Sequence, residues 1–253
     1  MSASLSAPPM LKLGKLPVRH DPRTLSLARY VDRAELPAPP AALDLTQRVP
    51  EWPMYANDVR GDCTCAAAAH MIEAWTAAAG DLVEVSEKDV LIAFDDVKVV
   101  DPYSGEEGAV ELDVLRYWRK SGIGGHRIGA YAAVSLHDET LVRAAAYLFG
   151  GLYIGLQLPV TAQAQDVWDW TGTLTGPARP GSWGGHAVDV VAYQAAGVEV
   201  VTWGARKQMT WSFWERYVEE CYCILSPDFL RAGRAPNGFD LVALKADLAL
   251  VTA

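Results

Sequence analysis

The sequence has few of the features that mark nucleic-acid-binding or membrane proteins. It carries 22 basic against 31 acidic residues, a formal net charge of -9, and no Lys/Arg-rich run. Phosphate backbones are bound by basic surfaces, so we expect no nucleic-acid partner. No apolar run approaches the roughly 18 residues of a membrane span, and residues 1–16 lack the apolar core of a signal peptide. We therefore expect a cytoplasmic protein without a membrane partner, and association with a virus particle stays open.

Cysteine is also scarce, with four in 253 residues, arranged as the Cys-x-Cys pairs Cys63/Cys65 and Cys221/Cys223. Four cysteines are too few for a disulfide scaffold of this size. Structural zinc sites usually separate paired cysteines by about two to four residues. We therefore expect reduced thiols, no metal and no cofactor. On composition alone, each cysteine is a small apolar core residue.

Apolar and aromatic residues, by contrast, are plentiful. Hydrophobic residues make up 51% of the chain, which includes nine Trp and ten Tyr, enough to build one sizeable core. Residues 1–45 hold seven of the 15 prolines and show no sustained periodicity. We expect them to form an extended arm on a single domain of residues 46–253. The arm is too short and proline-rich for a helical inhibitory domain, so we do not expect it to inhibit.

Helical patterns precede strand patterns along the chain, which predicts an α+β fold. An Ala-rich helix is expected after Asp62, which would be its N-cap, and it ends at Gly80. Cap signals predict further helices over 90–97, 112–120 and 139–149. Short apolar runs between turn residues predict strands over 152–158, 187–193, 198–203 and 222–225.

Cys63 stands where a thiol becomes a nucleophile. A helix N-terminus and an adjacent imidazolium both lower the pKa of a thiol, and Cys63 falls in the first turn of the Ala-rich helix. A histidine from elsewhere in the chain would supply the imidazolium. His186 is the candidate, because it opens a strand behind Gly184 and Gly185, and glycines there let another backbone approach closely.

These residues resemble two motifs of the papain-like cysteine peptidases, in particular of a bacterial and viral branch. Residues 57–64, Asn-Asp-Val-Arg-Gly-Asp-Cys-Thr, resemble Gln-Gly-x-x-Gly-Ser-Cys-Thr, and residues 185–188 are Gly-His-Ala-Val. Leu36-Pro37 and Asp44-Leu45 resemble the first strand of the mature family domain. The resemblance covers about residues 36–225. It implies a two-lobed fold, with the nucleophile on a central helix of a helical half and an antiparallel β half behind it.

The resemblance also assigns roles. Cys63 would be the nucleophile and His186 its base, while the Asn57 side chain would join the Cys63 backbone N–H in the oxyanion hole. Asn57 is one methylene shorter than the family's Gln. Val201 stands where the family has the Asn that orients the imidazole. Thr202 could replace that Asn only if the register slips by one residue. We therefore expect a Cys-His dyad, with a backbone carbonyl or a water on the other ring nitrogen.

Four more residues belong to the expected site. Gly61 and Asp62 precede the nucleophile and Gly185 precedes the base, so all three support the cleft. Trp203 matches the family's indole over the catalytic imidazole. We also expect Cys63 to face a cleft that is open to solvent.

Three functions fit this site. The first is a thiol hydrolase that cleaves peptide or isopeptide bonds of a peptide or protein substrate through an acyl-enzyme on Cys63. The second transfers the same acyl group to an amine, as an acyltransferase or peptide cyclase. The third is a non-catalytic papain-like protein with a structural or interaction role, for instance in a viral assembly.

Overall fold

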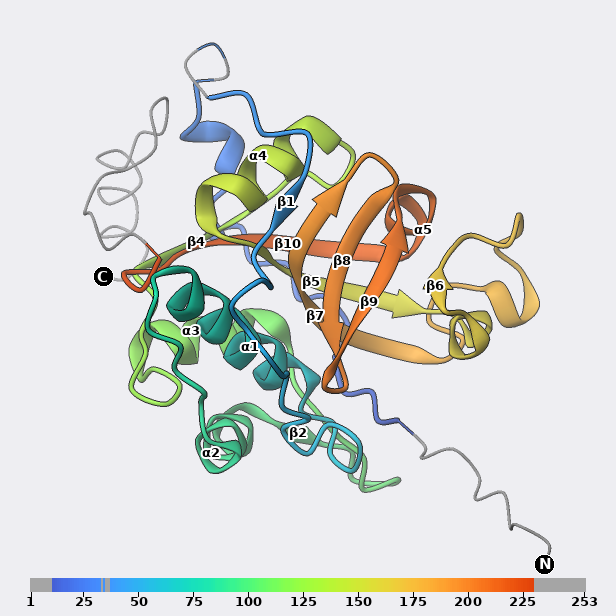
Figure 1. The fold of residues 1–253 in the computed structure, drawn as a ribbon. Coiled ribbons are helices and arrows are strands. Elements are labelled where there is room, and N and C mark those ends of the chain that lie inside the picture. The colour runs from blue at the N-terminus through green and yellow to red at the C-terminus, as the bar shows by residue number, and fades with distance from the viewer. Residues whose placement is uncertain (1–10, 33, 35–36, 230–253) are drawn as a thin grey trace, which may run out of the picture.

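The computed structural model describes residues 11–32, 34 and 37–229, so Leu36 of the expected first strand lies outside the description. Figure 1 shows α1, α2 and α3 gathered beside a strongly curved sheet. The helices are α1 Cys63–Ala78, α2 Glu87–Val97, α3 Glu111–Lys120, α4 Glu139–Phe149 and α5 Trp211–Tyr217, with 3-10 turns η1 Leu27–Arg29, η2 Val160–Ala164 and η3 Gly176–Ala178. The strands are β1 Leu43–Asp44, β2 Val99–Val100, β3 Glu107–Gly108, β4 Ala130–Ala133, β5 Leu152–Leu158, β6 Val167–Trp168, β7 Gly184–Gln194, β8 Gly197–Thr202, β9 Ala205–Thr210 and β10 Val218–Leu225.

Helix α1 is the central element of the helical half. Its first 15 residues are all buried, and it packs against β7 on one side and against α2 and α3 on the other. Six of these 15 positions are alanine, which keeps the helix narrow and lets a strand backbone approach it. The helix begins at Cys63, as predicted. Asp62 occupies the N-cap position, but its carboxylate accepts no hydrogen bond from the first turn.

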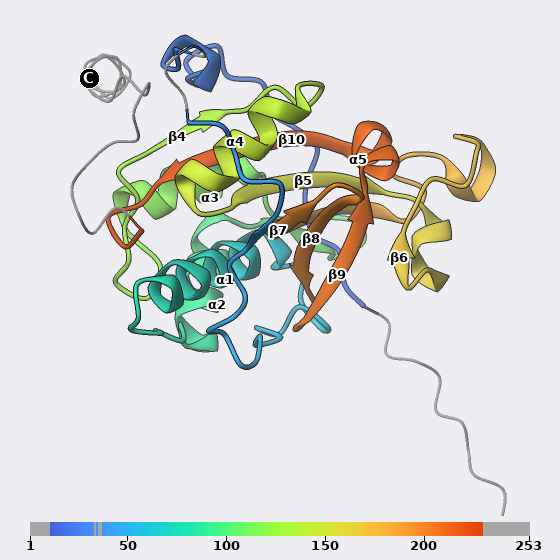
Figure 2. The same cartoon turned by 45° about the horizontal axis from the view of Figure 1, so that its top comes forward.

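The large sheet has eight strands in the order β4-β10-β5-β7-β8-β9-β6, and β1 pairs with β7 off this path. Figure 2 shows α4 on the opposite side of this sheet from α1. Strand β5 alternates accordingly, because its even-numbered leucines and Ile154 pack in the core below α4 whereas Tyr153 packs with α1. The next residue on the face of Tyr153 is Gly155, which leaves room there for another side chain.

The mixed helix-and-sheet class agrees with the α+β prediction. The four expected helices and four expected strands are present, most with bounds shifted by one to four residues. Strand β9 escapes the pattern search because four of its six residues are polar and only Met209 is buried. No helix in the described part of the chain is long and apolar enough to cross a membrane.

A buried acid on α1 gives a prediction for stability against pH. The Tyr55 hydroxyl donates to Glu73, and burial raises the pKa of Glu73 from 4.5 to about 8. Native Glu73 therefore keeps its proton while the unfolded chain loses it, so the free energy of unfolding falls as pH rises from 4.5 to 8. We expect a slope of up to about 1.4 kcal/mol per pH unit from this group.

Urea unfolding between pH 6.5 and 8 measures this slope, in a window above the titration of neutral His70, whose pKa burial lowers to about 4. Glu73→Gln should flatten the slope, whereas Glu51→Gln, at an exposed position, should leave it in place. An unchanged slope in Glu73→Gln would mean that Glu73 is already ionised in the native protein.

Candidate active site

The fold places Cys63 and His186 on two elements that pack against each other. Cys63 is the first residue of α1, and His186 is the third residue of β7, the strand against which α1 packs. The backbone N–H of Ala187 lies within hydrogen-bonding reach of the Cys63 sulfur. The thiol is therefore next to the start of β7, one residue from the imidazole.

His186 is held on its ring edge and on its ring face. Its Nε2 is 2.7 Å from the Thr202 hydroxyl, and its ring stacks on the Trp203 indole with centroids 4.4 Å apart. The other ring nitrogen, Nδ1, is buried and has no hydrogen-bond partner among the described residues. The Thr202 hydroxyl therefore stands at the ring nitrogen where a backbone carbonyl or a water was expected, which corrects that expectation. Val201 points elsewhere and packs with Ala74 in a small apolar cluster.

Internal hydrogen bonds hold the loop of residues 57–62, which precedes Cys63. The Asn57 side-chain amide donates to the Asp62 carboxylate at 3.2 Å and to the Arg60 carbonyl at 3.3 Å. Burial raises the pKa of Asp62 to about 7, against the opposing effect of the Asn57 hydrogen bond. Asn57 thus supports the turn into α1, and its amide hydrogens are engaged within the loop.

Residues 13–16 of the arm pass directly over Cys63, and glycines on both sides make room for them. The Gly14 N–H lies within hydrogen-bonding reach of the Cys63 sulfur. A Cβ on Gly14 would lie 1.8 Å from the Gly61 carbonyl oxygen, and one on Gly185 would lie 2.2 Å from the Lys15 carbonyl oxygen. Gly185 therefore permits a close backbone approach, as its position in the sequence suggested, and the backbone that approaches is the arm.

Backbone hydrogen bonds hold this segment between β7 and the residues before α3. Lys15 N–H donates to the Gly185 carbonyl at 3.1 Å, and Leu16 N–H donates to the Ala109 carbonyl at 2.9 Å. Ala109 N–H in turn donates to the Gly14 carbonyl at 2.8 Å. The Gly14 N–H therefore faces the thiol, while the Gly14 carbonyl accepts a hydrogen bond from Ala109. A peptide held in this way is not placed for attack.

Solved structures with a similar fold include cysteine proteases. Xylellain from Xylella fastidiosa matches with a TM-score of 0.64 and 15% identity over 88% of this chain and 99% of that one. Procathepsin B S9 from Trypanosoma congolense matches with a TM-score of 0.58 and 14% identity, over 85% and 86% of the two chains. The Carica candamarcensis protease CMS1MS2, in complex with E-64, gives 0.51 and 15% over 74% and 99%. The fold is papain-like. No protein-family model and no curated protein matches the sequence.

The papain-like cleft is closed at Cys63. Cys63 is only 1% exposed, and burial raises the pKa of its thiol from 9.0 to about 12 despite the N–H groups of Ala187 and Gly14. Burial also lowers the pKa of His186 to about 3. Thiol and imidazole are therefore both neutral near pH 7. The expectation of an open cleft is wrong for this state, because residues 13–16 fill it.

The other cysteines of the papain-like domain lie in its core. Cys65, Cys221 and Cys223 are free and buried, and burial raises the pKa of each. Within the described ranges, no group of three or more His, Cys, Asp or Glu side chains could hold a metal ion.

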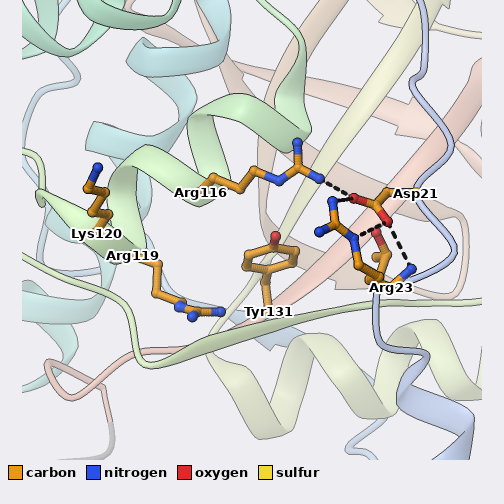
Figure 3. Close-up of a pocket in the computed structure, with 7 residues that line it drawn as sticks. Asp21, Arg23, Arg116, Arg119, Lys120 and Tyr131 are labelled. Carbon is orange, nitrogen blue, oxygen red and sulfur yellow. Dashed lines mark hydrogen bonds and ion pairs between the residues drawn. The ribbon is translucent and has the colours of Figure 1, made fainter. Parts of the chain in front are cut away.

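A second hollow on the papain-like domain lies away from the thiol, between the arm, α3 and β4. Figure 3 shows Arg23 and Arg116 directed at the Asp21 carboxylate, with Tyr131 beside them. These ion pairs hold the pKa of Asp21 well below its usual range, chiefly through the Arg23 side chain. The residues that line the hollow include no cysteine or histidine, and its two central guanidinium groups are already paired.

Sequence reasoning missed one buried residue of the cleft, Lys15. Its side chain has no exposed surface, and its ammonium lies 2.5 Å from Glu219 and 2.7 Å from Glu220. The only signal in the sequence is a lysine set among apolar neighbours in the arm, which by itself does not indicate burial.

Proposed function

We propose that the chain is a cysteine peptidase of the bacterial or viral papain-like type, with Cys63 as nucleophile and His186 as base. The observation that supports this most is a thiol at the first residue of α1, within reach of the Ala187 N–H. Ala187 directly follows His186, whose Nδ1 has no hydrogen-bond partner among the described residues. The substrate class is a peptide or an unfolded protein segment that takes the place of residues 13–16.

The chemistry follows from these two groups. His186 Nδ1 takes the thiol proton as the Cys63 sulfur attacks the substrate carbonyl carbon, and the C–N bond breaks as the imidazolium returns that proton to the leaving amine. Water, deprotonated by the same nitrogen, then hydrolyses the thioester. Nε2 must keep its hydrogen throughout, and the Thr202 hydroxyl oxygen is placed to accept a hydrogen bond from it.

The developing oxyanion needs donors at the start of α1. The Cys63 N–H is one of the first helical N–H groups, which have no partner within a helix. Asn57 can add its amide only after it leaves the Asp62 carboxylate. We therefore assign Asn57 a weaker contribution than the Gln of the family motif would make.

The arm makes this peptidase latent. Residues 13–16 occupy the cleft with an N–H on the sulfur, so a substrate can bind only after they leave. This placement favours an inhibitory role for the arm, contrary to the expectation from its length and composition.

Digestion of unfolded casein by the full chain tests the proposal. Released peptides should accumulate slowly with the unaltered chain, and Cys63→Ala should release none. Cys65→Ala serves as the matched control, because Cys65 lies on the same helix but is buried in the core. Peptide release that survives Cys63→Ala contradicts the proposal, and transfer of the acyl group to an added amine would indicate an acyltransferase.

A further inference from the structure

The Lys15 side chain fills a pocket that opens from the cleft beside Cys63. A Cβ on Gly155 would lie 2.1 Å from Lys15 Cε, so the pocket floor is glycine backbone. The same atom would lie 2.7 Å from Glu111 and from Glu220, which places both carboxylate side chains at this floor. Glu219 closes the outer side, where the Gln157 amide also donates to it at 2.6 Å.

The walls of this pocket are built for a cation. Burial alone would lower the pKa of Lys15, but Glu111, Glu220 and Glu219 outweigh it and raise that pKa. Glu111 is fully buried, and its two carboxylate oxygens have no hydrogen-bond partner among the described residues. Buried carboxylates are costly unless a positive charge or a hydrogen-bond donor faces them. Burial raises the pKa of Glu111 well above its usual range even with Lys15 beside it. Glu219 and Glu220, which pair with the Lys15 ammonium, are therefore the groups that favour another cationic side chain once Lys15 leaves.

We propose that this pocket is a subsite for a lysine or arginine side chain of the substrate, and that Lys15 occupies it as an internal mimic. The inference rests on the proposed function, since it names the substrate class of that cleft. The backbone of the segment fixes where the basic residue lies. Gly14 is over the sulfur and Lys15 is its neighbour, so the subsite takes a side chain one residue removed from the one at the thiol.

A binding experiment that needs no catalysis tests the pocket. Lys15→Ala removes three carbons and the ammonium, which n-propylammonium replaces. At 100 mM this ion should raise the thermal midpoint of Lys15→Ala by about 3 °C, and n-propanol, of the same length but uncharged, should not. In the matched control Lys98→Ala, the lost ammonium pairs with Asp95 and Glu107 at the surface, so no such difference should arise. Equal effects of the two compounds on Lys15→Ala would overturn the inference.

A substrate comparison tests the specificity. Pairs of peptides are compared that differ only in lysine or norleucine at one position, for each of the two positions on either side of the scissile bond. At one of these positions only, the lysine peptide should be cleaved about 10- to 100-fold faster than the norleucine peptide. Glu219→Gln with Glu220→Gln should bring that ratio close to one, because these two carboxylates pair with the Lys15 ammonium. The unaltered chain can also be used, since a competing arm lowers both rates by the same fraction and leaves their ratio intact.

The two proposals fail in different ways. If the chain hydrolyses peptides without a preference for lysine, the proposed basic subsite is contradicted and the proposed peptidase activity is supported. If n-propylammonium, but not n-propanol, raises the thermal midpoint of Lys15→Ala and the chain cleaves no peptide, the basic pocket is supported and the proposed peptidase activity is contradicted.

Discussion

Gly14→Ala should raise the rate at which iodoacetamide labels Cys63 by about 1000-fold at pH 7.5. The added Cβ would lie 1.8 Å from the Gly61 carbonyl oxygen and 2.5 Å from Gly61 Cα, and backbone atoms cannot give way as a flexible side chain does. The segment over the thiol must therefore leave the cleft. The pKa of Cys63, which burial holds at about 12, then falls toward 9.0, and those three pH units are a thousandfold in the reactive thiolate.

Peptide mapping by mass spectrometry assigns the label to each cysteine. His20→Ala is the control, since it alters the same arm at an exposed position. Unchanged labelling in Gly14→Ala would show that the segment does not protect the thiol. Equal labelling of Cys65 and Cys63 would mean that the helix core has opened, so the rate ratio between these two cysteines is the quantity to follow.

In the Gly14→Ala background, His186→Ala should reduce peptide hydrolysis by about 1000-fold or more. The thiol then lacks a base during acylation, and the leaving amine lacks a proton donor. The expected loss is in kcat, with a smaller change in KM, because the imidazole acts on the reacting bond. Hydrolysis rates on a fluorogenic peptide measure both constants.

Thr202→Val separates orientation from chemistry. It removes the hydroxyl on His186 Nε2 but keeps the ring under the Trp203 indole, so kcat should fall by about 10- to 100-fold only. Thr140→Val, an exposed change on α4, should have no effect. If Thr202→Val costs as much as His186→Ala, the hydroxyl takes part in the proton transfer itself. If His186→Ala keeps full activity, His186 is not the base.

Local signals in the sequence account for much of the helical half. The Ala-rich run sets α1, Ser86 and Asp138 cap α2 and α4 through their side chains, and the apolar run of β5 is found at its full length. Cys63 and His186 were predicted from two short motifs, because residue type and the expected start of an element were enough to single them out.

Position-by-position matching failed where the backbone departs from a regular strand. Val201 was expected beside the imidazole, yet Thr202 is there. The pairing of β7 with β8 shifts register between Val190 and Ala192, and Trp203 follows with a φ of 47°. Such a bulge and turn redirect side chains without a mark in the residue types. Lys15 was missed for a related reason, because its burial depends on acids more than 90 positions away in the chain.

Residues 13–16 are tethered by backbone hydrogen bonds to Gly185 and Ala109, and the chain after them is held again by a bridge between Ser26 and Ala133. This segment therefore acts as an intramolecular ligand, whose effective concentration is set by tether length and reaches roughly millimolar values for short linkers. Dilution of the protein does not weaken such a ligand, and a free peptide must approach that concentration to displace it. A single cut in the exposed stretch at residues 19–20 would turn the segment into an ordinary dissociable peptide.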